Sequence, residues 1–446
     1  MNRAILTVIM LLLLPLATFA DNGRVSVREA IDLALERNHL LKAADYERQS
    51  AAHEVSASRS RYFPRVFLEE SAAASNAPTR VFMMKLDEGR FSQNDFAPSS
   101  LNHPDAYHDF RTALSLEMPL LDFTIGKGAG MAGKEEEARS LTLESRRQEI
   151  ASKVYAAFLE IRRAKAYLAA AQQALVDAQE HQRLAVVRSE AGVGLRSDEL
   201  RARTFLAEIE QQNITANNEL VLAKLRLSLV TGGDAGEPLD ITDEVDALDV
   251  TLDMAELKRL ARLERPDLKA MEKGAEKAAL GVAMARSAYL PTIYASASYQ
   301  LNDNTTPFGR DNDSWSVGAT LRWELFDGMR RRNEVGKTVA LEKAAAEYVT
   351  DYRQEVDFQV VEGFLRSQEV AKRLEVARHA VVDADESVRL LEKRFQNSLA
   401  TMVELLDAQM ALNKARANLV EMENQRARAA VTIYRAAGIF LQEVKK

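Results

Sequence analysis

Residues 374–395 read LEVARHAVVDADESVRLLEKRF, and their apolar side chains recur at alternating steps of three and four residues. This spacing averages about 3.5 residues, the period of helices that wind into a left-handed coiled coil. After Asn397-Ser398-Leu399 the same steps resume, and the apolar positions run from Leu405 to Met422. The stretch therefore predicts a long helical hairpin whose tip lies at residues 397–399.

A second hairpin is predicted earlier in the chain. No Gly or Pro occurs in the 58 residues from Lys134 to Ala191 or in the 37 residues from Leu195 to Thr231. Between these helical stretches lies Gly192-Val193-Gly194, whose two glycines suit a tight turn. We expect this turn to be the tip of the first hairpin.

The sequence is duplicated. Shifted by 227 positions, residues 26–64 align with 253–291 without a gap, and 13 of the 39 pairs are identical. Shifted by 206, Arg147-Gln148-Glu149 aligns with Arg353-Gln354-Glu355. Each copy is expected to hold one first helix (Ser26–Arg61 and Asp253–Ala288), two strands and one hairpin. The predicted boundaries are a signal peptide at 1–20, a first repeat at 21–232, a linker at 233–252, a second repeat at 253–438 and a short C-terminal tail at 439–446.

Alternation of apolar and polar residues predicts strands between the helices. The alternation is regular over residues 111–120, 292–301 and 314–325, and weaker over 65–74. Trp315 and Trp323, the only two tryptophans, fall on one apolar face. Along a tilted strand they are about 20 Å apart, close to the ~25 Å between the aromatic girdles of a membrane barrel. We expect a membrane-facing surface there; the alternative is the core of an ordinary packed sheet.

The composition excludes several classes of protein. The chain has 446 residues, no Cys and a formal charge of −7, which excludes cysteine chemistry and argues against a nucleic-acid-binding surface. An apolar run from Ala4 to Phe19 follows Arg3, and the small residues Thr18 and Ala20 suit cleavage after Ala20. We expect an exported protein; the alternative is an uncleaved membrane anchor. The sequence offers no catalytic triad or paired-carboxylate cleft, so we expect neither an enzyme nor a cofactor.

Four strands cannot close a barrel alone, because about eight is the smallest usual number. A four-stranded sheet with an apolar outer face therefore needs partner copies: two chains would give eight strands and three would give twelve.

The order of these features resembles the TolC family of outer-membrane efflux proteins over essentially the whole mature chain. The resemblance is carried by the junctions Tyr62-Phe63-Pro64 and Tyr289-Leu290-Pro291, the strand ends Leu121-Asp122 and Phe326-Asp327-Gly328, and the tip segment from Lys393 to Gln409. It implies a mainly α protein with a membrane β-barrel part. In a homotrimer, long coiled-coil hairpins would form a periplasmic α-barrel, and four strands per chain would contribute to a 12-stranded β-barrel in outer-membrane lipid.

The same resemblance implies a passive exit duct of a tripartite efflux or type I secretion system. Such a duct lies in the cell outer membrane, extends into the periplasm, and docks onto a periplasmic adaptor (membrane fusion) protein and an inner-membrane pump. The alternative from another class is a periplasmic coiled-coil adaptor or scaffold. That alternative would share the hairpins but has no use for strands with an apolar outer face.

By resemblance, Glu404 and Asp407 match an acidic ring at the periplasmic entrance. They are three residues apart on a predicted helix, so they share one face. Three chains would bring six carboxylates to a narrow opening and favour cations. The alternative is a solvated acidic tip.

The resemblance also implies a latch that holds the entrance closed. Asp198 and Ser197 match its acceptor positions, but Phe395 stands where a Tyr would donate and Ala400 where an Arg would sit. Because both donors are missing, that latch cannot form as such. The adaptor-docking surface is expected at the two tips: Gly192, Val193, Gly194, Leu195, Ser398 (in place of a second Gly), Leu399 and Thr401.

Two further stretches contain residue types that are found in binding sites. The stretch from Gly128 to Lys134 matches GxGxxG and most of a phosphate loop, but no parallel strand returns after the long helix, so nucleotide binding is not expected. His103, Asp105, His108 and Asp109 could be metal ligands by residue type. They lie in a predicted long loop, residues 76–109, for which a solvated loop facing the cell exterior is preferred.

Overall fold

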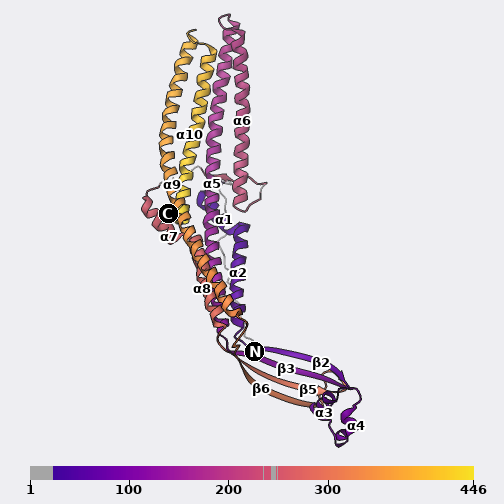
Figure 1. Cartoon of the computed structure of the whole chain (residues 1–446). Coiled ribbons are helices and arrows are strands. Elements are labelled where there is room, and N and C mark those ends of the chain that lie inside the picture. Colours follow the sequence, from indigo (N-terminus) through magenta and orange to yellow (C-terminus); the bar gives the residue numbers. More distant parts are fainter. Residues whose placement is uncertain (1–23, 235, 243–247, 249, 446) are drawn as a thin grey trace, which may run out of the picture. The chain divides into compact units, whose positions relative to one another are not determined.

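The computed structural model describes residues 24–445 apart from 235, 243–247 and 249. The predicted signal peptide lies outside these residues. The described chain is mainly helical, with two long hairpins and one four-stranded antiparallel sheet, which confirms the predicted fold class (Figure 1). Among the described residues, no helix combines the length and the apolar character needed to cross a membrane.

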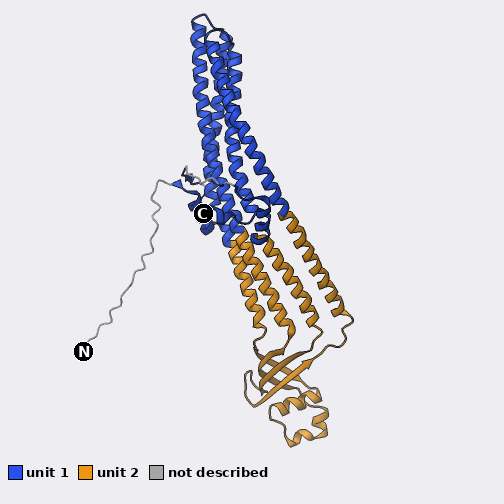
Figure 2. Ribbon diagram, turned by 90° about the vertical axis from the view of Figure 1, so that its left-hand side faces the viewer, with its two compact units in different colours: residues 1–42, 146–264, 357–446 blue, residues 43–145, 265–356 orange. Residues whose placement is uncertain are grey.

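The chain forms two compact units, and each takes segments from both repeats (Figure 2). Unit 1 holds the described residues up to Lys42, residues 146–264 and residues 357 onward. Unit 2 holds residues 43–145 and 265–356. The duplicated sequence therefore does not give one compact unit per repeat.

Unit 1 is built on the two predicted hairpins. The first is α5 (Phe123–Glu190) followed by α6 (Arg196–Val230), and the second is α9 (Arg330–Gln396) followed by α10 (Met402–Ala436). Only the C-terminal parts of α5 and α9 belong to unit 1. Both turns fall where the sequence predicted them. The heptad positions supply the core, and among the buried ones are Leu374, Ala377, Leu405, Leu412 and Met422.

Both hairpins end in the same way at the end opposite the tip. Gly232 and Gly438, which are 206 residues apart, follow α6 and α10 with φ of 82° and 75°. This left-handed conformation ends a helix and is favourable for glycine. The predicted C-terminal tail contains a short helix, α11 (Phe440–Val444), and the buried Phe440 ring packs edge-on against Tyr155 at 5.8 Å. A two-residue parallel pair, β1 (Arg24–Val25) with β4 (Asp240–Ile241), completes the unit.

The prediction of one continuous first helix per repeat is wrong. The structure has α1 (Val27–Arg37) and α2 (His39–Ser60) in the first repeat, and α7 (Met254–Glu264) and α8 (Pro266–Ser287) in the second. The breaks fall at the equivalent positions Asn38 and Arg265, both extended and both buried. The Asn38 amide donates to the Val230 carbonyl (3.0 Å), and its Oδ1 accepts from the Leu40 N–H (2.9 Å). In the second repeat Pro266 disfavours the helical conformation at the preceding residue, Arg265, which is extended.

Unit 2 carries the sheet, in the order β2-β3-β5-β6. Its strands are β2 (Arg65–Ser75), β3 (Tyr107–Leu121), β5 (Thr292–Asp303) and β6 (Asn312–Arg322), all antiparallel to their neighbours. The weakly alternating 65–74 segment is therefore a strand, as predicted. The last strand ends at Arg322 rather than Leu325, so Trp323 lies just beyond β6, where its indole N–H donates to the Tyr289 carbonyl (3.0 Å).

The predicted long loop between β2 and β3 is not irregular. It contains α3 (Pro78–Asp87), the 3-10 helix η1 (Gln93–Phe96) and α4 (Pro98–Asn102). Three phenylalanines hold it together, with Phe91 edge-on to Phe82 (4.6 Å) and to Phe96 (5.0 Å). Proline begins both α-helices, where its missing N–H costs no hydrogen bond. The described residues contain no group of three or more His, Asp or Glu able to hold a metal ion.

Candidate functional site

The first tip, residues 191–195, is a turn that glycine makes possible. Gly192 has φ of 73°, and the Val193 and Gly194 N–H groups both donate to the Arg188 carbonyl, at 3.0 and 2.9 Å. A Cβ on Gly194 would lie 3.0 Å from the Arg188 carbonyl carbon. The backbone of the turn thus folds back onto the end of α5 so closely that a side chain at position 194 would force its neighbours to shift.

The second tip, residues 397–401, repeats this turn with a serine. Ser398, which is 206 residues after Gly192, has φ of 60°. The Leu399 N–H donates to the Arg394 carbonyl at 2.7 Å. A left-handed conformation is costly for a residue with a Cβ. Ser398 therefore occupies a position whose backbone conformation is more favourable for glycine than for serine.

The two carboxylates of the predicted acidic ring differ in their surroundings. Both Glu404 and Asp407 are exposed. Glu404 also closes a capping box at the start of α10: its carboxylate accepts from the Thr401 N–H (2.7 Å) and hydroxyl (2.9 Å), and the Thr401 hydroxyl accepts from the Glu404 N–H. These hydrogen bonds, first that from the backbone, lower the pKa of Glu404. Glu404 is thus charged at neutral pH and held in one orientation.

The residues at the predicted latch positions are split between core and surface. Phe395 is 5% exposed and lies in a hydrophobic cluster to which α5, α6, α9 and α10 all contribute. Ala400 packs against the same cluster. Ser197 is exposed, and Asp198 lies in the first turn of α6. Phe395 and Ala400 offer no hydroxyl or guanidinium group at these positions, and the absence of the latch stays a prediction.

One residue that the sequence analysis missed connects the two tips. Arg188, near the end of α5, donates from Nη1 to the Gln396 carbonyl (3.2 Å) and from Nη2 to the Ser398 hydroxyl (2.8 Å). Its guanidinium also lies 5.0 Å from the centre of the Phe395 ring. The only signal in the sequence is its place four residues before Gly192. That signal is weak, because the chain has 59 basic residues.

Below the tips a polar layer interrupts the apolar seam between α5 and α10. Gln409 is only 1% exposed, and its Oε1 lies 3.2 Å from His181 Nε2. Its amide donates to Asp177 Oδ2 and Asn413 Oδ1, both at 3.2 Å. A buried polar group with specific partners favours one register of a coiled coil over others. No local pattern in the sequence pairs His181 with Gln409, which lies 228 residues away in the chain.

The tips also expose apolar side chains. Val193, Leu195 and Leu399 are each about two-thirds exposed. Gly192, Gly194 and Ser398 shape the turns beneath them, and Thr401 caps α10. Exposed apolar side chains mark a surface that binds another protein only where they form a continuous patch.

The sheet has two chemically different faces. Across the four strands Val66, Leu116, Ala297 and Val317 are aligned, and the next aligned set on this face is Leu68, Leu114, Tyr299 and Trp315. The opposite face has Phe67, Ser115, Ser298 and Ser316 in register. Trp315 and Trp323 are 75% and 57% exposed. One continuous apolar face is therefore exposed in the single chain, as the alternation predicted.

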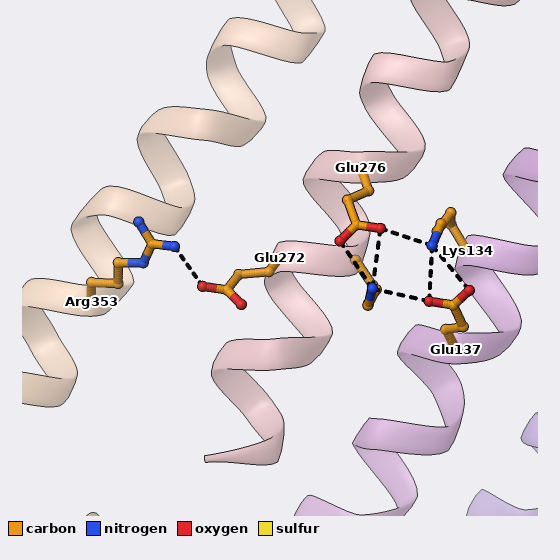
Figure 3. A network of polar contacts seen from close by, with 6 residues as sticks. Lys134, Glu137, Glu272, Glu276 and Arg353 are labelled. Atoms are coloured by element: carbon orange, nitrogen blue, oxygen red, sulfur yellow. Dashed lines mark hydrogen bonds and ion pairs between the residues drawn. The ribbon is translucent and has the colours of Figure 1, made fainter. Parts of the chain in front are cut away.

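The glycine-rich stretch that resembles a phosphate loop lies within α5, and its lysine is paired. Lys134 Nζ lies 2.9 Å from Glu276 and 3.0 Å from Glu137, and Lys273 bridges the same two carboxylates at 3.0 and 3.1 Å (Figure 3). Hydrogen bonds to these carboxylates, first Glu276, raise the pKa of Lys134. A second ion pair, Arg353 with Glu272 (2.5 Å), joins α9 to α8. These contacts tie three helices of unit 2 together.

Comparison with known proteins agrees with this architecture. The sequence profile of the family described as "Outer membrane efflux protein" matches residues 30–233 and 257–439, one match in each repeat. The chain is 23% identical over 432 residues to the proteases secretion protein PrtF of Dickeya chrysanthemi, covering 92% of this chain and 87% of PrtF. It is 24% identical over 316 residues to protein CyaE of Bordetella pertussis, covering 70% of this chain and 62% of CyaE.

Solved structures agree on the fold. The CmeC outer membrane channel of Campylobacter jejuni superimposes with a TM-score of 0.79 at 15% identity, covering 93% of this chain and 86% of CmeC. The open state of the MtrE outer membrane channel of Neisseria gonorrhoeae gives 0.76 at 17% identity, covering 93% and 89%. The family profile spans most of both repeats, so the chain belongs to the outer membrane efflux protein family, the TolC-like outer-membrane channels of efflux pumps and type I secretion systems.

Proposed function

We propose that three copies of this chain assemble into a passive conduit that receives cargo from a periplasmic adaptor and an inner-membrane pump. The observation that carries the proposal is the sheet of unit 2, which has one continuous apolar face and two open edges, β2 and β6. Inside a bilayer every backbone N–H and C=O needs a partner. Neighbouring copies that pair β6 with β2 would supply those partners, and three copies would close a twelve-stranded sheet.

The hairpins support assembly independently of the sheet. On α6, Leu200, Ala207, Ile214 and Val221 are spaced by seven residues, and all four are exposed. On α9, the exposed Phe358 and Leu365 are also seven apart. An apolar stripe with a heptad period is half of a coiled-coil seam, which is stable only when a second helix covers it. Helices of a neighbouring copy are the proposed cover.

Glu404 and Asp407 are proposed to form the acidic entrance of this conduit. Three chains would place six carboxylates around the opening, where their summed negative potential favours cations. Replacing both with alanine should lower the cation-to-anion permeability ratio in single-channel recording. An unchanged ratio would refute the ring, although not the conduit.

The exposed apolar side chains Val193, Leu195 and Leu399 are the proposed docking surface for the adaptor. The chain is similar over most of its length both to a relative named for secretion, PrtF, and to one named for efflux, the probable efflux pump outer membrane protein SepC of Pseudomonas putida. The proposal therefore concerns the conduit and assigns no cargo.

The mass of the detergent-extracted protein from separated membrane fractions tests the assembly. An outer-membrane species of three times the chain mass is the expected result. A monomer in the soluble periplasm would instead favour the alternative, a coiled-coil adaptor or scaffold, because the apolar face of the sheet would then be covered in some other way.

A further inference from the structure

In unit 2 the helices meet the sheet at two junctions, one in each repeat, and the two are packed differently (Figure 2). At the second, the Arg331 guanidinium lies 5.0 Å from the centre of the Tyr289 ring and pairs with Asp327 at 2.9 Å. At the first, Tyr62 takes the place of Tyr289, 227 residues earlier, and a Cβ on Gly126 of α5 would lie 2.7 Å from its hydroxyl. A buried arginine therefore fills the second junction, whereas a glycine faces the tyrosine at the first.

A groove of about 650 Å³ lies at the first junction. It is lined by the end of α2 and the turn after it (Arg59, Tyr62 and Phe63) and by small residues of α5 (Ala129, Gly130 and Gly133). A Cβ on Gly133 would meet no atom within 4 Å, so the groove is open beside the α5 backbone at this point. Its volume lies within the range of sites that hold a small molecule, and aromatic and small residues make most of its wall apolar.

The charged residues of the groove differ in their pairing. Lys134 and Glu137 line it too, but both already belong to the network of ion pairs with α8 (Figure 3). Arg59 is exposed, and across the described part of the chain no carboxylate lies within ion-pair distance of it. The groove therefore keeps one unpaired positive charge, in a chain whose formal charge is −7. An anionic group is the complement of this charge.

The surroundings of Arg59 indicate that the anion is part of an amphiphile. Phe63 is 66% exposed, and two residues later begins β2, whose Val66 and Leu68 lie on the apolar face of the sheet. Exposed aromatic and basic side chains beside an apolar surface are typical of the boundary between a membrane and water, where phospholipid phosphates lie. A guanidinium donates two parallel hydrogen bonds to a phosphate. The groove thus offers a donor for a phosphate next to an apolar wall for an acyl chain.

We propose that the groove binds one anionic phospholipid, whose phosphate lies on Arg59 and whose acyl chain lies along Ala129 and Gly133. The inference rests on the proposed function, which places the apolar face of the sheet in the bilayer and the first junction among lipid headgroups. Arg59 selects the charged headgroup, and the missing side chain at Gly133 leaves room for the hydrocarbon.

The test titrates phosphatidylglycerol, which is anionic, or phosphatidylcholine, which has no net charge, into the full-length protein in detergent and counts the bound lipids by native mass spectrometry. The parent should bind one phosphatidylglycerol per chain, at lower concentration than phosphatidylcholine. Because hydrogen bonds to a charged group contribute about tenfold or more to affinity, Arg59→Gln should weaken phosphatidylglycerol binding by about that factor and leave phosphatidylcholine binding nearly unchanged. Arg378→Gln is the matched control, since Arg378 is an exposed arginine of α9 in unit 1 that has no carboxylate partner among the described residues.

A second pair of variants tests the apolar wall. Gly133→Leu places a side chain in the groove and should weaken the binding of both lipids. Gly128→Leu is its control, because Gly128 lies on the same helix, does not line the groove, and likewise has no atom within 4 Å of its Cβ position. Equal affinity of the parent for the two lipids, or an equal loss in each variant and its control, would overturn the proposal. Release of the lipid by an excess of inorganic phosphate would show that the site takes free phosphate, and would overturn it too.

The same spectra keep this proposal apart from the proposed function. The mass of the lipid-bound species gives the number of chains, so a monomer that binds phosphatidylglycerol through Arg59 would refute the assembly and support the lipid site. A trimer whose lipid binding is unchanged in Arg59→Gln would support the assembly and refute the lipid site.

Discussion

Thr401 is the residue on which the start of α10 depends. Its hydroxyl accepts from the Glu404 N–H, and its own N–H and hydroxyl donate to the Glu404 carboxylate. Removing an N-cap side chain costs about 1 kcal/mol of local helix stability. Thr401→Ala should therefore speed hydrogen exchange of the first-turn amides of α10. Thr204→Ala is the control: Thr204 is exposed within α6 and bonds only to the Leu200 carbonyl (3.0 Å), so this change should leave exchange at both tips unaltered.

The same capping box makes the second tip sensitive to acid. Because the folded pKa of Glu404 is lowered from 4.5, the stabilisation by its carboxylate is present above that value and is lost as the pH falls through the lowered pKa. Exchange of the Thr401 amide, corrected for the intrinsic effect of pH, should accelerate below about pH 4.5. Glu404→Gln should remove this acid-dependent step, whereas a step that persists in the variant would mean that another group is responsible.

Single residues of the site differ in how far the sequence could identify them. Glu404 and Asp407 could be placed on one helix face because helical spacing is a local property. Arg188 and Gln409 could not be singled out, since their hydrogen-bond partners in the other hairpin are 208 or more residues away in the chain and no local pattern specifies a tertiary contact. The turn at Ser398 is an intermediate case: the family resemblance indicated a glycine position, and the φ of 60° is the left-handed conformation that glycine favours.

At the scale of elements, the first hairpin depends on how closely its turn packs onto α5. Gly194→Ala would bring a Cβ to 3.0 Å from the Arg188 backbone and should destabilise the turn by about 1–3 kcal/mol. Gly128→Ala is the contrasting substitution, because a Cβ there meets no atom within 4 Å and alanine favours helix by about 0.5–1 kcal/mol. Exchange of the Val193 amide should rise in the first variant and stay unchanged in the second. Equal rates in both would show that the close approach at Gly194 is unimportant.

The elements themselves were largely predictable, and the exceptions have physical reasons. Heptad spacing and the absence of Gly and Pro gave both hairpins because both signals are local. The helix break before Pro266 could have been predicted from the proline, but the gap-free alignment of the two repeats suggested one continuous helix. The equivalent break at Asn38 has no such signal in the sequence, because it depends on the hydrogen bond from Asn38 to the Val230 carbonyl. The helices between β2 and β3 were missed because their stability comes from the packing of Phe82, Phe91 and Phe96.

At the scale of the whole molecule, the alternation of apolar and polar residues was enough to predict which residues share each face of the sheet. A strand with a period of two must present one set of residues to each side. The order β2-β3-β5-β6 and the aligned rows across it came only from the structure, because strand pairing depends on contacts between distant segments. The number of copies in the assembly depends on how the edge strands β2 and β6 pair with those of a neighbouring chain. That pairing is a property of two chains, so the sequence pattern within one chain does not specify it.

Two adjacent residues in the middle of β6 can test which face of the sheet contacts lipid. Val317 lies on the apolar face beside Ala297, and Ser316 lies on the polar face beside Ser298. If the apolar face lies in the bilayer, Val317→Lys places a charge near its middle and should cost about 2–4 kcal/mol. Ser316→Lys would face the water-filled interior and should cost much less. The fraction of protein recovered as an assembled outer-membrane species should therefore fall for Val317→Lys and stay near the parent's for Ser316→Lys. The reverse order would place lipid on the polar side and refute the proposed assembly, since the apolar row would then have to line the conduit.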